Sequence, residues 1–203
     1  MKSIHRALFV VCLASLIGCA SAPPEITYYL LRAEQVEETI PIEAPVRAGI
    51  GRVVVAAYLM GSEGVMVETE PGEVRPATQH KWAEPLDAGL RWYVGSEVAA
   101  ELGYQIGGGL TDRSTWDYII DISISRMHGT MDGRAVLEAS FIVAPKDRGA
   151  KPSQGRFSRS IPLPQEGYSG IVEAQRILLS EFADQIGDVL RKRVEARQAD
   201  TAS

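Results

Sequence analysis

The 203-residue chain has only two cysteines and three histidines, and both scarcities limit what it can do. Cys12 lies within an apolar N-terminal stretch, and Cys19 directly follows that stretch. If Cys12 is removed with the stretch and Cys19 is modified, no disulfide can form, even in an oxidising compartment. The fold must then depend on its core, and 45% hydrophobic residues in a chain of single-domain length can supply one.

Basic residues and long apolar runs are also in short supply. The chain has 26 acidic and 21 basic residues, a formal net charge of -5. Loss of Lys2 and Arg6 with the N-terminal stretch would leave 19 basic residues and a net charge of -7. This balance argues against nucleic acid as a partner and against a basic membrane-binding patch. No later segment approaches the roughly 18 consecutive apolar residues that a transmembrane helix needs.

Cys19 is the most informative residue that is present. Lys2 and Arg6 precede an apolar core over residues 7–17, which is the layout of a secretory leader. Residues 16–19 read Leu-Ile-Gly-Cys and resemble the bacterial lipobox, in which the cysteine thiol is acylated and the leader is cut just before it. We therefore predict a signal peptide over residues 1–18 and lipidation of Cys19, with palmitate among the acyl groups. The alternative is an ordinary leader that happens to contain a cysteine.

The residues after the cysteine predict where the lipoprotein resides. In enterobacterial lipoproteins, an aspartate at the second position after the cysteine commonly retains the protein in the inner membrane. This chain has Ser21 at that position, which predicts the outer membrane, with the protein facing the periplasm. Pro23 and Pro24 predict an extended, lipidated tether over residues 19–26.

The remainder is expected to form one α+β domain over residues 27–196, followed by a disordered tail over residues 197–203. Alternating or β-branched apolar residues predict strands near residues 28–31, 52–58, 65–67, 118–125, 135–143 and 157–161. Helical spacing of apolar residues predicts a first helix from about Pro85 to Gly103 and a second, longer one from Ile171 to about Arg193. Asp132-Gly133 predicts the turn of a hairpin between the strands near residues 118–125 and 135–143. The order of elements predicts a largely antiparallel sheet with two amphipathic helices packed on one face.

A search for catalytic or metal-binding chemistry gives only weak candidates. His80 and His128 do not lie at ligand spacing from another histidine, cysteine or glutamate, so we interpret both as surface residues. The triple glycine of residues 107–109 lacks the lysine and hydroxyl residue of a phosphate loop. Three aspartates lack the glycine and glutamate of a calcium loop: Asp112, Asp117 and Asp121. We therefore expect no enzyme, no cofactor and no metal.

Two tryptophans and a basic run also have simple structural interpretations. Trp82 and Trp92 are expected to pack the first helix onto the sheet rather than to stack on a ligand. Residues 191–193, Arg-Lys-Arg, place positive charge at the negative end of the long helix dipole.

Several segments, taken in order, resemble one known family. They are Tyr28-Tyr29-Leu30-Leu31, Val53-Val54-Val55 leading to Tyr58-Leu59, Lys81-Trp82-Ala83-Glu84-Pro85-Leu86, Leu102-Gly103, and Val136-Leu137-Glu138-Ala139 after the Tyr118 strand. This pattern resembles the ABC-type transport auxiliary lipoproteins, the PqiC-like family, over nearly the whole mature chain. Its sharpest element is the Trp-Ala-Glu-Pro-Leu run at residues 82–86. Residues 60–64, Met-Gly-Ser-Glu-Gly, replace an acidic-basic pair and an apolar stretch that are usual in the family.

The resemblance implies a function as well as a location. It implies an outer-membrane lipoprotein that works with an MCE-domain protein of the inner membrane and with the permease and ATPase, or other membrane protein, associated with it. The leading hypothesis is a non-enzymatic docking component for lipid transport between the two membranes. Two alternatives are a lipid carrier that uses the groove between helices and sheet, and an envelope-assembly lipoprotein of similar build. A periplasmic hydrolase is the least favoured.

Overall fold

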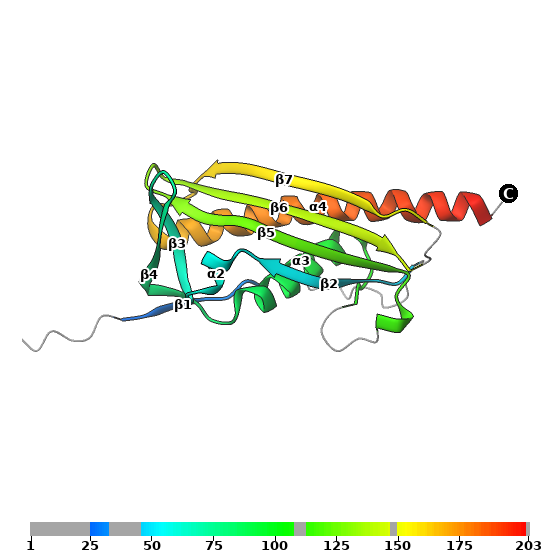
Figure 1. The fold of residues 1–203 in the computed structure, drawn as a ribbon, viewed down its shortest axis with the longest axis horizontal. Helices are drawn as coiled ribbons and strands as arrows, with labels where there is room; N and C mark the ends of the chain where they lie inside the picture. The colour runs from blue at the N-terminus through cyan, green and yellow to red at the C-terminus, as the bar shows by residue number, and fades with distance from the viewer. Residues whose placement is uncertain (1–24, 33–45, 108–112, 147–149, 202–203) are drawn as a thin grey trace, which may run out of the picture.

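Strands and two long helices follow one another in the order that the sequence predicts. The computed structural model describes residues 25–32, 46–107, 113–146 and 150–201. The elements, shown in Figure 1, are β1 (Thr27–Tyr29), β2 (Ala48–Val55), α2 (Ala57–Met60), β3 (Gly64–Glu70), β4 (Glu73–Trp82), α3 (Leu86–Leu102), the 3-10 helix η1 (Arg113–Thr115), β5 (Tyr118–Thr130), β6 (Arg134–Pro145), β7 (Ser153–Pro162) and α4 (Gly167–Thr201).

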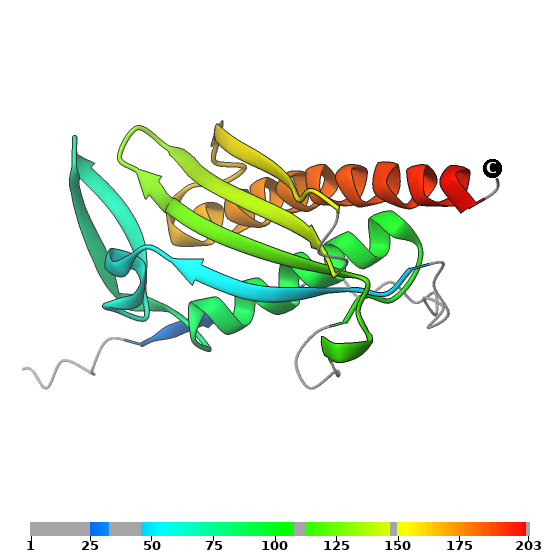
Figure 2. The same cartoon turned by 45° about the vertical axis from the view of Figure 1, so that its right-hand side comes forward.

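Within the described parts of the chain, seven strands form one open sheet in the order β1-β4-β3-β5-β6-β7, with β2 paired to β5. The pairs β3–β4, β5–β6 and β6–β7 are antiparallel. The pairs β1–β4, β2–β5 and β3–β5 are parallel. Helices α3 and α4 cover the same face of this sheet, as Figures 1 and 2 show. The predicted class, α+β with two helices on one face of a largely antiparallel sheet, is confirmed.

The sheet branches along β5. Residues 118–124 of β5 pair with β2, whereas Gly129 and Thr130 pair with β3. Beyond this point β3, β4 and β1 form an arm that leaves the plane of the main sheet (Figure 2). The branch point therefore leaves a short length of β5 without a strand on that side.

Two glycines end elements as the sequence predicts. Gly103 follows α3 with a φ of 73°, the left-handed conformation that closes a helix, and its N–H bonds to the carbonyl of Ala99 at 2.9 Å. Gly133 has a φ of 76° in the tight turn between β5 and β6.

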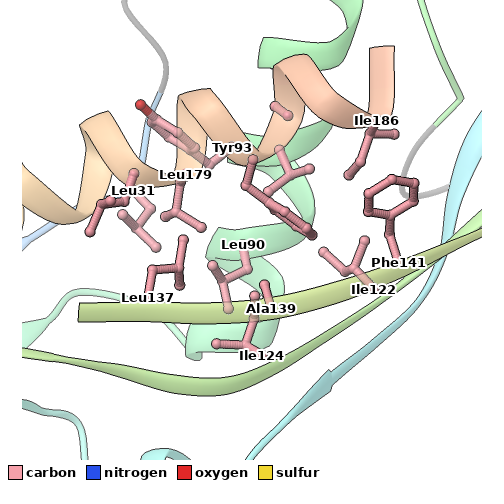
Figure 3. Packing of buried hydrophobic residues seen from close by; sticks show 14 of the residues in the cluster. Leu31, Leu90, Tyr93, Ile122, Ile124, Leu137, Ala139, Phe141, Leu179 and Ile186 are labelled. Carbon is pink, nitrogen blue, oxygen red and sulfur yellow. The ribbon is translucent and has the colours of Figure 1, made fainter. Parts of the chain in front are cut away.

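The core lies between the sheet and the two helices. The predicted inward residues of β5 and β6 are buried: Tyr118, Ile120, Ile122, Ile124, Ala135, Leu137, Ala139, Phe141 and Val143. Figure 3 shows side chains of β5 and β6 pointing toward those of α3 and α4, with Leu179 and Ile186 on the helix side. Phe182 is fully buried and meets Phe141 and Phe157 edge to face, with ring centroids 5.9 Å and 5.8 Å apart. Burial of apolar area at this interface is the main source of stability.

Several predictions about elements and packing differ from the structure. The strand expected at residues 52–58 is β2, but it covers Ala48–Val55, and Tyr58 lies in the single-turn helix α2. Residues 197–201 belong to α4, where a disordered tail was expected. The basic run at residues 191–193 therefore lies before the last turn of α4 and not at the negative end of its dipole, as was expected. Trp82 is buried as expected, but Trp92 is 52% exposed on the outer side of α3, so it does not pack that helix onto the sheet.

The molecule is elongated, and its two ends differ in what they contain. The described chain begins at one end, beside β1, and α4 ends at the opposite one (Figure 1). We call the first the proximal end, formed by residues 25–32, 57–86, 128–136 and 160–171. The other is the distal end, formed by residues 46–48, 102–107, 113–118, 143–146, 150–153 and 190–201.

Candidate functional site

The predicted lipidation site, Cys19, lies outside the described residues, as do the predicted leader and the first part of the predicted tether. The structure does show where the chain coming from that site joins the domain. Glu25 and Ile26 lie at the proximal end and lead directly into β1. The proximal end is therefore the part of the domain that an anchor on Cys19 would hold.

β1 is fixed to the rest of the domain through Tyr29. The Tyr29 hydroxyl lies 3.0 Å from Nδ1 of His80 on β4 and 3.2 Å from Oγ of Ser169 on α4. The His80 ring stacks on Tyr168, with ring centroids 4.3 Å apart and an interplanar angle of 19°. His80 thus lies inside strand β4 among aromatic rings, and its role is to join β1, β4 and the start of α4.

Two arginines hold the backbone that follows β1. Arg32 makes a two-pronged ion pair with Glu84, with one Nη2–Oε2 distance of 2.9 Å. Arg176 of α4 donates a hydrogen bond to the carbonyl of Leu30 at 2.8 Å. These contacts join the segment after β1 to Glu84, just after β4, and to α4, in addition to the pairing of β1 with β4.

A groove of about 620 Å³ opens beside β1. Its walls come from β1, from the loop after α2 and from the Trp-Ala-Glu-Pro-Leu run: Tyr28, Leu59, Met60, Gly61, Ser62, Glu63, Trp82, Ala83, Glu84, Pro85 and Leu86. Trp82 is 7% exposed and Leu86 6%, so the sequence motif forms the floor of this groove. Residues 60–63, which belong to the stretch that departs from the family pattern, form one of its walls.

Tyr58 fills the gap where the sheet branches. Its hydroxyl accepts a hydrogen bond from the backbone N–H of Met127 at 3.0 Å. That N–H lies in the part of β5 which neither β2 nor β3 reaches, so the tyrosine replaces a missing strand partner. The same hydroxyl lies 3.1 Å from Nδ1 of His128, to which it can donate a hydrogen bond.

His128 continues this polar cluster into β3. Its Nε2 lies 3.3 Å from a carboxylate oxygen of Glu68, which also pairs with Arg126 at 3.3 Å. Arg126 in turn bonds to Glu138 on β6 at 3.0 Å. A neutral imidazole with its proton on Nε2 satisfies both the tyrosine and the glutamate. The cluster of Tyr58, Glu68, Arg126, His128 and Glu138 therefore ties α2, β3, β5 and β6 together.

Burial sets the protonation of this cluster. His128 is only 3% exposed, and desolvation, with the positive charge of Arg126, lowers its pKa. Desolvation also raises the pKa of the Tyr58 hydroxyl. The backbone N–H of Gly72, with help from His128 and Arg126, lowers the pKa of Glu68. At neutral pH, His128 and Tyr58 are therefore neutral and Glu68 is ionised.

The cluster corrects the interpretation of His128 as a surface residue. Sequence reasoning found that His128 closes a strand, but it missed Tyr58, Glu68 and Arg126 as its partners. The sequence did carry one signal of a polar cluster. Arg126 lies two residues before His128 on one strand, so both side chains lie on the same face. The partners themselves come from other segments and carry no local signal.

The distal end has a different chemistry, centred on Asp117. Its carboxylate accepts the backbone N–H of Arg47 at 2.9 Å and pairs with Arg197 at 3.3 Å. Desolvation of the Asp117 carboxylate opposes its ionisation, but the contacts with Arg47 and Arg197 outweigh desolvation and lower the pKa of Asp117. Arg193 donates to Oγ of Ser153 at 2.8 Å, which joins the last turns of α4 to β7. A polar groove of about 570 Å³ lies between Asp117, Lys146, Arg193 and Arg197.

Within the described ranges, no group of three or more histidine, cysteine, aspartate or glutamate side chains is arranged to hold a metal ion. None of the helices there is long and apolar enough to span a membrane. Of the sequence candidates, residues 108 and 109 of the triple glycine and Asp112 lie outside the described ranges. Asp121 accepts the backbone N–H of Arg52 at 2.6 Å, which stabilises the bulge in β2.

Fold and site together define a class: an elongated α+β domain whose described amino end, beside β1, lies opposite the end of α4, with polar clusters that tie its strands and helices together. Comparison with known proteins agrees with that description. The family model for the ABC-type transport auxiliary lipoprotein component matches residues 29–187, so the chain belongs to that family. It is accordingly a lipoprotein of the cell envelope, associated with a transport system. The predicted family resemblance is confirmed.

Solved structures share the fold at low sequence identity. One, of a protein described only as uncharacterized, superposes with a TM-score of 0.68 at 18% identity, covering 82% of this chain and 99% of its own. Another, a protein from Xanthomonas campestris assigned to a domain family of unknown function, gives a TM-score of 0.62 at 17% identity, covering 87% and 100%. A search of curated protein sequences gives no match.

Proposed function

We propose that this lipoprotein is a non-enzymatic docking component of an MCE-type or ABC-type transport system that moves lipids between the inner and outer membranes. Its lipid anchor on Cys19 would lie in the outer membrane, and the domain would face the periplasm. The partner would be an MCE-domain protein of the inner membrane with its permease and ATPase, or another associated membrane protein. The family match over residues 29–187 is the observation that carries this proposal.

The arrangement of the two ends supports docking. The chain from Cys19 joins the domain at the proximal end, and α4 ends at the opposite, distal end (Figure 1). A protein held by its proximal end in a membrane would present its distal end and flanks to the periplasm. The proximal contacts of Tyr29, Arg32 and Arg176 would let the anchored segment resist load from a bound partner.

The free edge of β7 offers a route for partner binding. In the described part of the sheet, β7 pairs only with β6, so ten residues of strand present one unpaired backbone edge. An extended segment of a partner can add to such an edge through main-chain hydrogen bonds. Arg156 and Ser158 are exposed on this strand and would flank an added segment.

Site-specific crosslinking tests the proposal. A photoreactive residue at Ser158 on β7 or at Gln185 on the outer side of α4 should capture an MCE-domain protein in intact cells. The same residue at Tyr28, at the proximal end, is the matched control and should capture none. The same residue at Glu195 samples the distal end. Failure of Ser158, Gln185, Glu195 and every other exposed β7 position to capture such a partner would refute docking. Neighbouring genes for MCE or ABC components distinguish this function from an envelope-assembly role.

A second candidate function is lipid carriage. The space between helices and sheet, where a carrier pocket was expected, is filled by the packed side chains that Figure 3 shows. A groove of about 780 Å³ lies instead at the proximal end, between the β5–β6 turn and the start of α4. Met131, Leu163 and Ile171 give it apolar walls. Phospholipid retained by the protein on gentle extraction and detected by mass spectrometry would favour this function; a lipid-free protein would dispose of it.

A further inference from the structure

The proximal end carries an unusual share of the exposed apolar side chains. Nine large hydrophobic side chains are exposed among the described residues, and four of them belong to β1, its flanks and α2. They are Ile26 (42% exposed), Tyr28 (58%), Leu30 (44%) and Met60 (53%). Single exposed apolar residues need no explanation, but a group of them marks a contact surface.

These side chains form one surface. Ile26, Tyr28 and Leu30 alternate along an extended segment, so they lie on the same side of it. The intervening Tyr29 faces His80, and Leu31 is buried in the core. Tyr28 and Met60 both line the 620 Å³ groove whose floor includes Trp82. We call this set of four exposed residues the apolar ridge.

The position of the apolar ridge limits what can cover it. Seven residue steps separate Cys19 from Ile26, which at about 3.5 Å each gives a span of at most about 25 Å. If Cys19 carries the anchor, the ridge is held within that distance of the lipid headgroups. A bilayer surface is then present at a very high local concentration, because the tether makes contact intramolecular.

The chemistry of the ridge fits a bilayer surface. An aromatic ring with a hydroxyl, such as Tyr28, favours the level of the headgroups, and aliphatic side chains favour the acyl region just below. The charged residues beside the groove are paired with one another, Arg32 with Glu84 and Lys81 with Glu63 at 3.7 Å. Pairing reduces the cost of bringing this end of the protein close to lipid.

We propose that the apolar ridge is a membrane-contact surface that lies in the headgroup region of the same leaflet that holds the Cys19 anchor. This rests on the proposed anchoring at Cys19. The anchor supplies attachment, and the ridge fixes the orientation of the domain. α4 then projects away from the membrane, and the distal end points into the periplasm.

The test uses full-length lipidated protein in vesicles of phosphatidylethanolamine and phosphatidylglycerol that contain headgroup nitroxide lipids. Lipidation leaves no free thiol in the mature chain, so one introduced cysteine can carry a fluorophore. The variants Ile26→Cys, Tyr28→Cys, Leu30→Cys and Met60→Cys should be quenched several-fold more strongly than Thr27→Cys. Thr27 is exposed, equally near the anchor and on the other side of the segment, so it separates insertion from mere proximity. Glu195→Cys at the distal end should show no quenching.

Several outcomes would overturn the inference. Equal quenching at Thr27 and its neighbours would mean proximity without contact. Protection from a water-soluble quencher without nitroxide quenching would mean that a second copy or the protein's own acyl chains cover the ridge. If the fluorophore reacts with Cys19 of the wild-type protein, that thiol is free and the anchor is absent. This result would overturn the proposed function as well as the inference.

Discussion

The two ends of this molecule are built on the same sheet and the same long helix, yet their surfaces differ in kind. At the proximal end, exposed apolar side chains such as Tyr28 and Met60 surround a groove, and aromatic rings fasten β1. At the distal end, Asp117 and its arginine partners form a polar, charged surface. Because α4 runs from one end to the other, the core can fix the distance between two surfaces of different chemistry. The comparison suggests that the proximal end meets the membrane and that the distal end is open to a partner.

The largest expected effect comes from removing the anchor. Cys19→Ser should abolish incorporation of labelled palmitate and remove the protein from the outer-membrane fraction, because the predicted acyl anchor needs the thiol of Cys19. Metabolic labelling and membrane fractionation measure both effects. Cys12→Ser is the matched control, because that cysteine leaves with the leader. Outer-membrane attachment that survives loss of Cys19 would remove the distinction between the two ends, whereas retention at the inner membrane through an uncut leader would not.

Loosening the shared core should affect both ends together. Phe182→Ala removes a fully buried ring that contacts Phe141 and Phe157, so we expect a loss of about 3–5 kcal/mol in the free energy of unfolding. Urea denaturation measures it, and hydrogen exchange should rise at the proximal and distal ends alike. Ile177→Ala on the outer side of α4 is the control, with a change of about 0.5 kcal/mol or less. Faster exchange at one end alone would mean that the ends unfold independently.

Removing the Tyr58 hydroxyl should act on one end only. Tyr58→Phe leaves the N–H of Met127 and Nδ1 of His128 without their partner, and we expect a loss of about 1–3 kcal/mol. Hydrogen exchange should quicken in β3 and β4, at the proximal end, and change little in η1 and the last turns of α4. Tyr28→Phe removes an exposed hydroxyl and should be nearly neutral. A neutral Tyr58→Phe would show that the branch of the sheet does not need this cluster.

Part of this structure could be predicted from the sequence, and the reason is locality. The alternation from Tyr118 to Ile124, the turn glycine Gly133 and the helix stop at Gly103 are signals that adjacent residues carry. These signals were enough to predict the sheet, the hairpin and the two helices. The family-like run at residues 82–86 also pointed to a segment that the structure places at the proximal groove.

What the sequence did not reveal depends on contacts between distant segments. Tyr58 was assigned to a strand, because its role at the branch of β5 requires knowing that β2 ends and β3 begins there. His128 was interpreted as exposed, since its partners Glu68 and Tyr58 are 60 or more positions away. Trp92 was expected in the core although it lies off the apolar stripe of α3. The residues at helical spacing, such as Leu90 and Val94, are the ones that are buried.

The smallest expected effect is a pH dependence that differs between two aspartates of equal charge. Asp117, at the distal end, has a lowered pKa, so its contribution to stability is present above the ordinary aspartate pKa and is lost as pH falls through the lowered one. Asp184, on α4, has a pKa raised by desolvation and by nearby acidic residues, first among them Glu101. Its charge is therefore unfavourable at neutral pH, and the penalty disappears as pH falls.

Substitution of each aspartate by asparagine removes one negative charge and serves as the control for the other. Asp117→Asn should lower the free energy of unfolding at pH 7 by about 1 kcal/mol or less, and the difference should shrink as pH falls below the ordinary aspartate pKa. Asp184→Asn should instead raise stability slightly at pH 7, with the gain also vanishing in acid. Urea unfolding between pH 3 and pH 7, a range of about four units that covers the ordinary aspartate pKa, measures both. Effects of the same sign would show that net charge, rather than the local contacts of the distal end, governs the response.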